Sequence, residues 1–297
     1  MEDLQIKIDD FKSKYPISEE LKSRIPEPRF EFFGEMVWNM AVHALLCGKN
    51  LLLTGEKSTG KNVLAENLAK AFGRPLWNVS FHVNIDQSGL IGTDTLKNGS
   101  VVFEEGPIYQ VATSGGFGVL DEINMAKNEA AAVLHSILDY RRIIDIPGSE
   151  IIKLSPASRF IATMNYGYAG TRELNEALLS RFVVIEMPRM EAKDLVRFLK
   201  KEFPLMKGTY ADQFAELYSD LIKKSEAGEI SSSGVDIRGI VDALDLVNSG
   251  LSVKESLDMG LTNKSFDPYE RQLIQDAINA RLPKGLTRKD IFEGNYV

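Results

Sequence analysis

The octapeptide GEKSTGKN at residues 55–62 decides the fold of this chain. It matches the phosphate-binding pattern G-x-x-x-x-G-K-S/T at every defined position except the last, where Asn62 replaces Ser or Thr. The largely apolar residues 50–54 before it are typical of a short buried strand, and apolar residues recur at helical spacing after it, from 63 to 71. Strand, glycine-rich loop and helix are the context that the pattern requires.

In that geometry successive backbone N–H groups and the helix N-terminus face phosphate groups, and a lysine reaches the phosphate oxygens. We therefore expect Lys61 to bind phosphate. The final Ser or Thr normally offers a hydroxyl to Mg²⁺, and Asn62 can offer a neutral amide oxygen instead. The substitution leaves open whether the protein hydrolyses nucleotide or only binds it. The residues expected to hold the nucleotide are Gly55, Glu56, Lys57, Ser58, Thr59, Gly60, Lys61, Asn62 and Val63.

The composition is that of a globular protein of one large domain or two modest ones. Of 297 residues, 44% are hydrophobic and 26% charged, which is enough for a sizeable core. The net charge of −7 and the absence of a basic run do not favour nucleic acid as a partner. No apolar stretch reaches the length of a membrane span, and the acidic N-terminus lacks a signal peptide's apolar segment. We expect a cytoplasmic protein.

Cys47 is the only cysteine, which excludes an intrachain disulfide and a cysteine-clustered zinc site. It ends the apolar run 44–47, so we expect it to be buried as a small hydrophobic residue.

Strands and helices alternate through residue 188, which predicts a largely parallel sheet covered on both faces. A helix interrupted by a hairpin is expected over 87–103, turning at Asn98-Gly99, and a second hairpin over 142–154. A helix is expected over 32–46, with Met40 among the residues of its inward face. The predicted strands are 50–54, 75–79, 117–120, 160–165 and 182–187.

Beyond Pro188 the pattern changes to helices without a convincing strand. The predicted helices are 194–201, 211–224, 239–248 and 268–281. We therefore divide the chain into a polar, proline-punctuated N-terminal arm (1–28), an αβα core (29–189) and a C-terminal helical domain (190–297).

Two carboxylates end the strand before residue 122. Asp121 at a strand's carboxyl edge can order the ligand shell of Mg²⁺, and Glu122 can polarise a water for in-line attack. The alternative is a solvated Asp-Glu turn. The upstream phosphate loop favours the chemical interpretation.

Asn165 closes the fourth predicted strand. A sheet order that puts this strand between the loop strand and the carboxylate strand would aim its amide at the γ-phosphate and the attacking water. The alternative is a turn-forming asparagine. Arg181 follows a predicted helix and can serve as a cation at the helix C-terminus or as an arginine finger that completes a neighbouring subunit's site. Arg172 is a second candidate for that finger.

Taken in this order, these residues resemble the AAA+ ATPases, and more closely the MoxR and dynein/midasin-related branch. Residues 90–108 resemble that branch's helix-2 insert, 121–124 its Walker B motif and 164–182 its segment from sensor 1 to the arginine finger. The hairpin over 142–154 is similar to the pre-sensor 1 insertion. The resemblance covers about residues 30–250.

The resemblance implies an αβα core with a helical lid, assembly into a ring that is usually a hexamer, and ATP with Mg²⁺ bound between subunits. It places Arg238 where the sensor 2 arginine is expected, the alternative being a plain surface arginine. The implied catalytic residues are Glu122, Asn165 and Arg181, and the implied Mg²⁺ shell contains Asn62 and Asp121.

The expected function is therefore that of a MoxR-type ATPase, which couples ATP hydrolysis in a homo-oligomeric ring to the remodelling or activation of a client protein. The resemblance also implies a partner with a von Willebrand factor A domain. Asn62 and the lack of a recognisable effector module keep a second hypothesis open, a nucleotide-gated assembly protein with little hydrolysis. A third is a restriction-type motor that acts on DNA, against which the acidic charge argues. The sequence leaves the client, the ring size and the choice between ATP and GTP open.

Overall fold

The computed structural model describes residues 2–81, 85–126, 128–145, 151–166 and 174–294. The chain divides into two compact units, Met1–Pro188 and Arg189–Val297. The division falls where the sequence changes from alternating strands and helices to helices alone.

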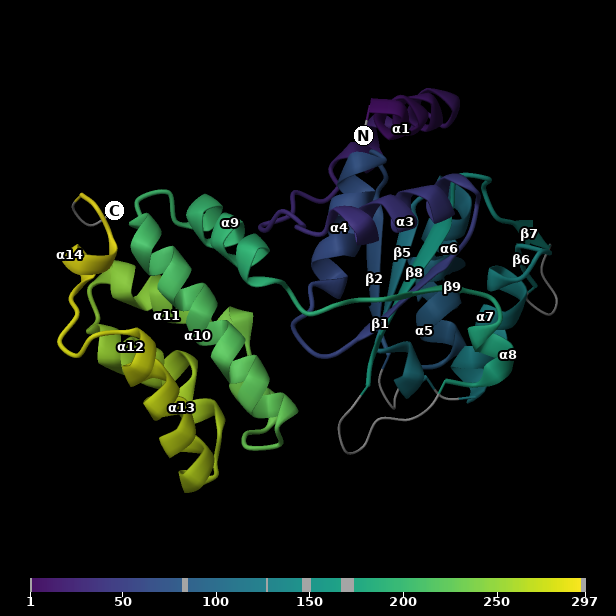
Figure 1. Cartoon of the computed structure of the whole chain (residues 1–297). Helices are drawn as coiled ribbons and strands as arrows, with labels where there is room; N and C mark the ends of the chain where they lie inside the picture. Colours follow the sequence, from purple (N-terminus) through teal and green to yellow (C-terminus); the bar gives the residue numbers. More distant parts are fainter. Residues whose placement is uncertain (1, 82–84, 127, 146–150, 167–173, 295–297) are drawn as a thin grey trace. The chain divides into compact units, whose positions relative to one another are not determined.

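A five-stranded parallel sheet with the strand order β2-β5-β8-β1-β9 forms the centre of the first unit (Figure 1). The prediction of an α/β fold with a mainly parallel five-stranded sheet and a helical C-terminal region is confirmed. Because every neighbouring pair is parallel, the five carboxyl ends meet at one edge of the sheet. The strands are β1 (Leu51–Gly55), β2 (Leu76–Ser80), β5 (Phe117–Asp121), β8 (Arg159–Asn165) and β9 (Val183–Glu186).

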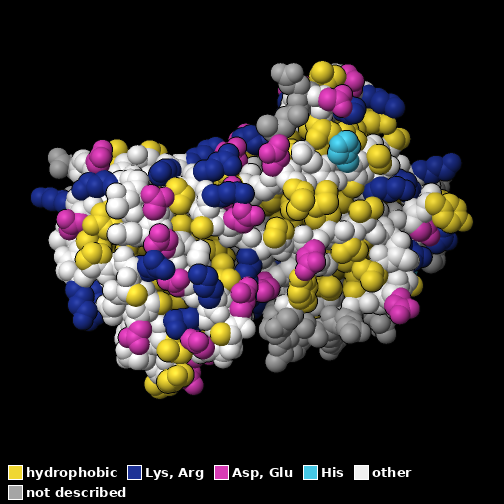
Figure 2. Space-filling view, viewed as in Figure 1, with side chains coloured by type: hydrophobic (Ala, Val, Ile, Leu, Met, Phe, Trp, Pro, Cys, Tyr) yellow, Lys and Arg dark blue, Asp and Glu magenta, His cyan; other side chains and the backbone are white. Residues whose placement is uncertain are grey.

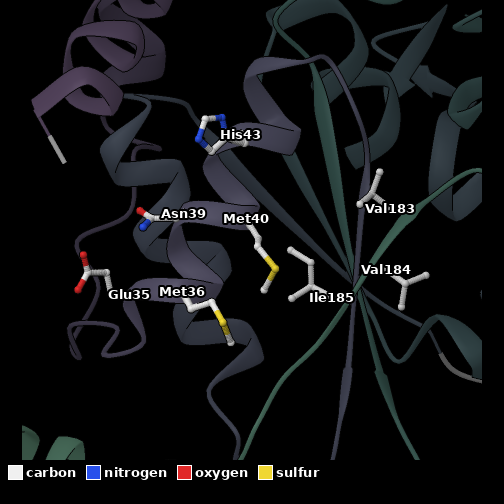
Figure 3. A pocket seen from close by; sticks show the side chains of 8 residues that line it. All are labelled: Glu35, Met36, Asn39, Met40, His43, Val183, Val184 and Ile185. Carbon is white, nitrogen blue, oxygen red and sulfur yellow. The ribbon is translucent and has the colours of Figure 1, made fainter.

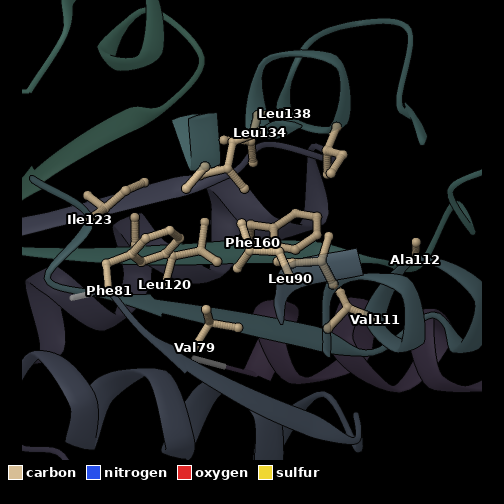
Figure 4. Packing of buried hydrophobic residues seen from close by; sticks show 14 of the residues in the cluster. Val79, Phe81, Leu90, Val111, Ala112, Leu120, Ile123, Leu134, Leu138 and Phe160 are labelled. Carbon is tan, nitrogen blue, oxygen red and sulfur yellow. The ribbon is translucent and has the colours of Figure 1, made fainter. Parts of the chain in front are cut away.

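Helices cover both faces of the sheet because its strands are apolar on both sides. Leu51 and Leu53 of β1 pack in one buried cluster with α1 (Glu2–Lys14), α3 (Glu35–Leu46) and α4 (Lys61–Ala71). Leu52, between them, packs in the other cluster. Figure 4 shows that second cluster, where Leu120 and Phe160 of the sheet meet the helices. Its helices are α5 (Gln87–Ile91), α6 (Pro107–Ser114) and α7 (Asn128–Leu138).

The first residues of the chain pack against the sheet's helical layer. Ile8 and Phe11 of α1 are buried in the cluster of α3 and α4, three residues apart and so on one face of the helix. A four-residue helix, α2 (Glu19–Lys22), follows. The segment that we expect to be an arm therefore belongs to the first unit and adds to its core.

Two expectations about α3 are wrong. Cys47 is exposed, because the helix ends at Leu46 and the cysteine lies just beyond its last turn. Met40 is also exposed: Val37 and Ala41 of the predicted face are buried, but the buried face of α3 extends to Val42 and Leu45 and leaves Met40 outside it. Met40 lines an apolar groove of about 820 Å³ between α3 and the edge strand β9 (Figure 3).

Both predicted hairpins form in the described part of the chain. The first joins β3 (Gly92–Lys97) to β4 (Ser100–Glu105) and is exposed along most of its length. The second pairs β6 (Ile143–Ile144) with β7 (Ile152–Lys153), and the predicted turn at 147–149 lies outside the described residues.

The second unit is built from helices, and all four predicted ones are present. The unit also holds two short helices that the sequence pattern does not predict, α12 and α14. In it α11 and α12 approach closely through Gly239 and Gly260: a Cβ on Gly239 would lie 2.1 Å from the carbonyl oxygen of Gly260. The helices are α9 (Ala192–Glu202), α10 (Gly208–Glu226), α11 (Ile237–Ser249), α12 (Val253–Gly260), α13 (Pro268–Arg281) and α14 (Arg288–Ile291).

Two buried arginines hold the amino edge of the sheet in the first unit. Arg159, 4% exposed, donates from Nε to the carbonyl oxygen of Leu45 at 2.8 Å and from Nη1 to that of Pro156 at 2.6 Å. Burial lowers the pKa of Arg159 to about 10, with neighbouring arginines adding to the effect. Leu45 lies in the last turn of α3, the end of the helix that carries a partial negative charge. Its carbonyl oxygen also accepts the backbone N–H of Gly48 at 3.0 Å.

Arg74 is 2% exposed and joins the ends of two more helices. It donates to the carbonyl oxygen of Tyr15, just after α1, and to that of Gly115, just after α6, the latter at 3.3 Å. The ring of Phe11 lies against the guanidinium groups of both arginines. At each of three helix C-termini, a carbonyl group therefore accepts a hydrogen bond from a buried arginine.

Replacing Arg159 by Leu should destabilise the protein by about 3 kcal/mol, because the hydrogen bonds of a buried guanidinium group to three carbonyl groups are lost. The free energy of unfolding, measured by urea denaturation, tests this. Arg141→Leu is the matched control: its guanidinium pairs with Asp139 at the surface, so its loss should cost less than about 1 kcal/mol. Equal effects of the two substitutions would contradict the role given to Arg159.

Candidate functional site

The phosphate loop follows β1 directly and depends on two glycines. At Gly55 φ is 153°, and a Cβ there would lie 2.8 Å from the carbonyl oxygen of Met187. Gly60 has φ of 84° at the N-cap of α4. Neither position suits a residue with a side chain. The strand, the loop and the helix thus follow one another as the octapeptide predicts.

The side chain of Lys61 is folded into this loop and is buried. Its Nζ donates to the carbonyl oxygens of Gly55 at 3.0 Å and Glu56 at 2.6 Å, and lies 3.3 Å from Oγ1 of Thr59. The ammonium group therefore sits at the N-terminus of α4, within the loop whose geometry favours an anion. Asn62, one residue on, is exposed on the first turn of the helix.

The sheet order brings the predicted polar residues to the same edge. β8 lies between β1 and β5, as the proposed role of Asn165 requires. The register pairs Gly55 of β1 with Asn165 of β8, and β8 in turn pairs with β5, which ends at Asp121. The start of the phosphate loop, Asn165 and the two carboxylates of 121–122 are therefore neighbours across three strands.

Asn165 and Glu122 contact each other at this edge, with Nδ2 of Asn165 donating to Oε1 of Glu122 at 3.5 Å. Thr163 contacts both carboxylate residues: its hydroxyl donates to Oδ1 of Asp121 and accepts from the backbone N–H of Glu122 at 3.2 Å. The sequence analysis missed Thr163. Its position two residues before Asn165, and so on the same face of β8, is the signal that could have identified it.

Arg181 lies just beyond α8 (Glu176–Leu179). Nε donates to the carbonyl oxygen of His135 at 3.1 Å, and Nη1 donates to that of Ala177. Burial, and then the charge of Arg181, lower the pKa of His135. Arg181 therefore lies beside the last turn of α7 and beside α8, and its role as an arginine finger stays a prediction. Arg172, the other candidate finger, lies outside the described residues.

Arg238 belongs to the second unit, in the first turn of α11. Its side chain is exposed, and its backbone N–H donates to Oδ1 of Asp236 at 3.0 Å. Asp236 also accepts a hydrogen bond from Nζ of Lys264 at 2.7 Å. The start of α11 is therefore held by its own cap, which leaves Arg238 at the surface of the unit.

Residues 50–182 match the family model described as AAA domain (dynein-related subfamily). YojN of Bacillus subtilis (strain 168), named as an uncharacterized protein, is 35% identical over 280 residues, which cover 93% of this chain and 91% of that protein. The chain therefore belongs to the same family as YojN, and its residues 50–182 are similar to AAA domains of the dynein-related subfamily. SH1500 of Staphylococcus haemolyticus, also named as uncharacterized, is 34% identical over 250 residues, covering 82% of this chain and 95% of that protein. The AAA assignment supports nucleotide binding and ATPase activity in general terms.

A crystal structure of a Cytophaga hutchinsonii protein matches 94% of this chain and 96% of that one, at 15% identity and a TM-score of 0.49. This likeness is too weak to bear on function. Within the described residues of this AAA protein, no helix is both long and apolar enough to span a membrane.

The oxygen atoms of the side chains at the candidate site suit a metal ion that binds together with a nucleotide. Among the residues that the structure describes, no group of three His, Cys, Asp or Glu side chains could hold a metal ion alone. The carboxylate of Asp121 and the amide of Asn62 are the side chains expected to contribute. Mg²⁺ is commonly held by one or two carboxylates together with water and substrate phosphates, so this donor set fits Mg²⁺ with a nucleotide.

Replacing Asn62 by Thr should leave the Mg²⁺ requirement of nucleotide binding equal or lower, because a hydroxyl replaces a neutral amide ligand at an exposed helical position. Titrating Mg²⁺ against the protein with a fluorescent ATP analogue measures this. Lys61→Ala is the reference for lost phosphate binding, and Lys70→Ala, at the surface of the same helix, is the control expected to bind normally. A marked loss of binding in Asn62→Thr would show that the asparagine has another role.

Proposed function

We propose that this chain is the ATP-hydrolysing subunit of a MoxR-type ring that remodels or activates a partner protein. One contact carries the proposal: Nδ2 of Asn165 donates to Oε1 of Glu122 at 3.5 Å, at the sheet edge where the phosphate loop begins. A base for water and an amide to orient it thus lie beside a loop built to hold phosphate.

Each side chain at this edge has a distinct role in the proposed reaction. Lys61 and the N–H groups of the loop hold the phosphates, and Asp121 with Asn62 hold the metal's ligand shell. Glu122 takes the proton of the attacking water, and Asn165 orients that water toward the γ-phosphate. Mg²⁺, when bound, neutralises charge on the phosphate oxygens.

We propose that Arg181 of one subunit completes the site of the next, which requires a homo-oligomer, with six subunits expected from the resemblance. Its acceptors in the single chain are neutral carbonyl groups. Arg238 of the lid is the proposed second contact to the γ-phosphate.

The β3–β4 hairpin is the proposed contact to the client. Leu96 and Val101 are exposed on it, although they are large apolar residues, and such exposure is typical of an interaction surface. The ring of Phe103 packs 5.3 Å from that of Tyr109, so α6 anchors the hairpin to the core. A von Willebrand factor A-domain partner, and a cytoplasmic setting, are part of this proposal.

Asn62 is the observation that favours the rival function, nucleotide-gated assembly with little hydrolysis. Phosphate release from the purified protein with Mg²⁺, at concentrations that allow assembly, separates the two proposals. The charge distribution gives less support to a DNA motor: Figure 2 shows Lys and Arg interspersed with Asp and Glu on the viewed face, and the net charge is −7. Salt-dependent retention on duplex DNA would revive that alternative.

Glu122→Gln should reduce ATP turnover at least a hundredfold while ATP binding persists, because the amide cannot accept the proton of water but keeps the size of the side chain. Phosphate release and equilibrium nucleotide binding measure the two effects. Glu19→Gln, at an exposed position in α2, is the control with normal turnover. Normal turnover in Glu122→Gln would remove this residue from the mechanism.

Mixing two inactive variants should restore turnover if Arg181 acts between subunits. In a mixed ring, a subunit carrying Arg181→Ala keeps its Glu122, and a Glu122→Gln neighbour can supply the arginine. We expect each variant alone to be at least a hundredfold slower than the wild type, and the mixture to regain a measurable fraction of the activity. A mixture as inactive as its components, although sedimentation shows mixed assemblies, would assign Arg181 to its own subunit.

A further inference from the structure

One buried hydroxyl joins the two carboxylate residues of the candidate site. Thr163 of β8 is 1% exposed, and its Oγ1 donates to Oδ1 of Asp121. The same oxygen accepts the backbone N–H of Glu122 at 3.2 Å. A hydroxyl has a single proton, so this pair of contacts fixes its direction toward Asp121.

The backbone at Glu122 explains why the second contact matters. Glu122 has φ of 54° and ψ of 45°, the left-handed conformation that residues with a side chain rarely adopt. This turn ends β5 and carries the side chain of Glu122 to Asn165. The bond from its N–H to Thr163 holds the turn at the point where the strand stops.

The first contact restricts Asp121 in a similar way. One carboxylate oxygen, Oδ1, is engaged by Thr163, which sets the orientation of the carboxylate plane. The other oxygen is then the one turned to a ligand. A hydrogen bond from a buried hydroxyl to a charged acceptor is strong enough to fix one side-chain rotamer.

We propose that Thr163 is the positioning residue of the site: its one hydroxyl orients the metal-side carboxylate of Asp121 and the water-side carboxylate of Glu122 together. The proposal rests on the proposed ATPase function for the identity of the ligand. It predicts that loss of the hydroxyl disturbs the Mg²⁺ requirement and the hydrolytic step together, through Asp121 and Glu122. Lys61 and the phosphate loop should bind nucleotide as before.

The test compares Thr163→Val, which keeps the shape of the side chain and removes the hydroxyl, with Thr163→Ser, which keeps the hydroxyl. Thr262→Val is the matched control. Thr262 is 2% exposed, and its Oγ1 has no hydrogen-bond partner within the described residues, so the same substitution there removes a hydroxyl that fixes nothing. If Thr163→Val does not fold, Thr163→Ala takes its place in the comparison.

Two measurements are made on the full-length chain: the Mg²⁺ concentration that half-saturates binding of a fluorescent ATP analogue, and kcat for ATP at saturating Mg²⁺. In Thr163→Val we expect the first to rise about tenfold and kcat to fall about tenfold or more, as for the loss of one hydrogen bond to a charged group. Binding of the analogue in EDTA should not change. In Thr163→Ser both quantities should stay within about threefold of the wild-type values. In Thr262→Val both should equal the wild-type values.

The same measurements in an Asp121→Asn background show whether Thr163 acts through Asp121. If it does, adding Thr163→Val to Asp121→Asn should raise the Mg²⁺ requirement by much less than tenfold. A wild-type Mg²⁺ requirement in Thr163→Val, or an equal defect in Thr163→Ser, would overturn the proposal, the latter because packing of the methyl group would then be what matters. Absence of turnover in the wild type would refute the proposed ATPase instead, and the Mg²⁺ titration would still decide on Thr163.

Discussion

The parallel pairing of β8 with both β1 and β5 is the constraint on which the rest of this structure depends. It is a contact between segments that lie far apart in the chain, and apolar residues on both faces of each strand make it stable. Once this pairing forms, Gly55 and Asn165 are partners in the register of β1 and β8. The carboxylates of Asp121 and Glu122 then lie at the same carboxyl edge of the sheet. The site is thus a consequence of strand order.

The same polarity explains the opposite edge of the sheet. Helices that cover a parallel sheet run antiparallel to its strands, so their N-termini lie at the carboxyl edge and their C-termini at the amino edge. The partial positive charge of the N-terminus of α4 suits a phosphate beside Lys61, while the negative C-termini of α1, α3 and α6 face Arg74 and Arg159. One fold geometry therefore creates a site for an anion at one edge and favours cations at the other.

The local patterns of the sequence predict much of this architecture. The apolar runs predict the five strands, the glycines predict the loop, and the change at Pro188 marks the division into two units. What they do not predict is contact at long range. Thr163 looks like any strand threonine until β8 is paired with β5, and Arg159 looks like an ordinary surface residue until α3 ends beside it.

The errors in α3 have a similar cause. Helical periodicity shows that one face is apolar, but the exact face depends on what packs against it. Here the sheet and α1 select Val42 and Leu45, so Met40 turns outward toward β9. Cys47 shows a second limit of sequence patterns, which do not place the end of a helix to within one residue. Because α3 ends at Leu46, Cys47 lies just beyond the helix and is exposed.

Lys61 and Arg181 share one feature with the structural arginines: each donates hydrogen bonds to main-chain carbonyl groups. Lys61 donates to Gly55 and Glu56, and Arg181 donates to His135 and Ala177. A carbonyl dipole orients a cation without neutralising it. These carbonyl groups therefore position Lys61 and Arg181 in advance of a phosphate, which suits the proposed site between two subunits.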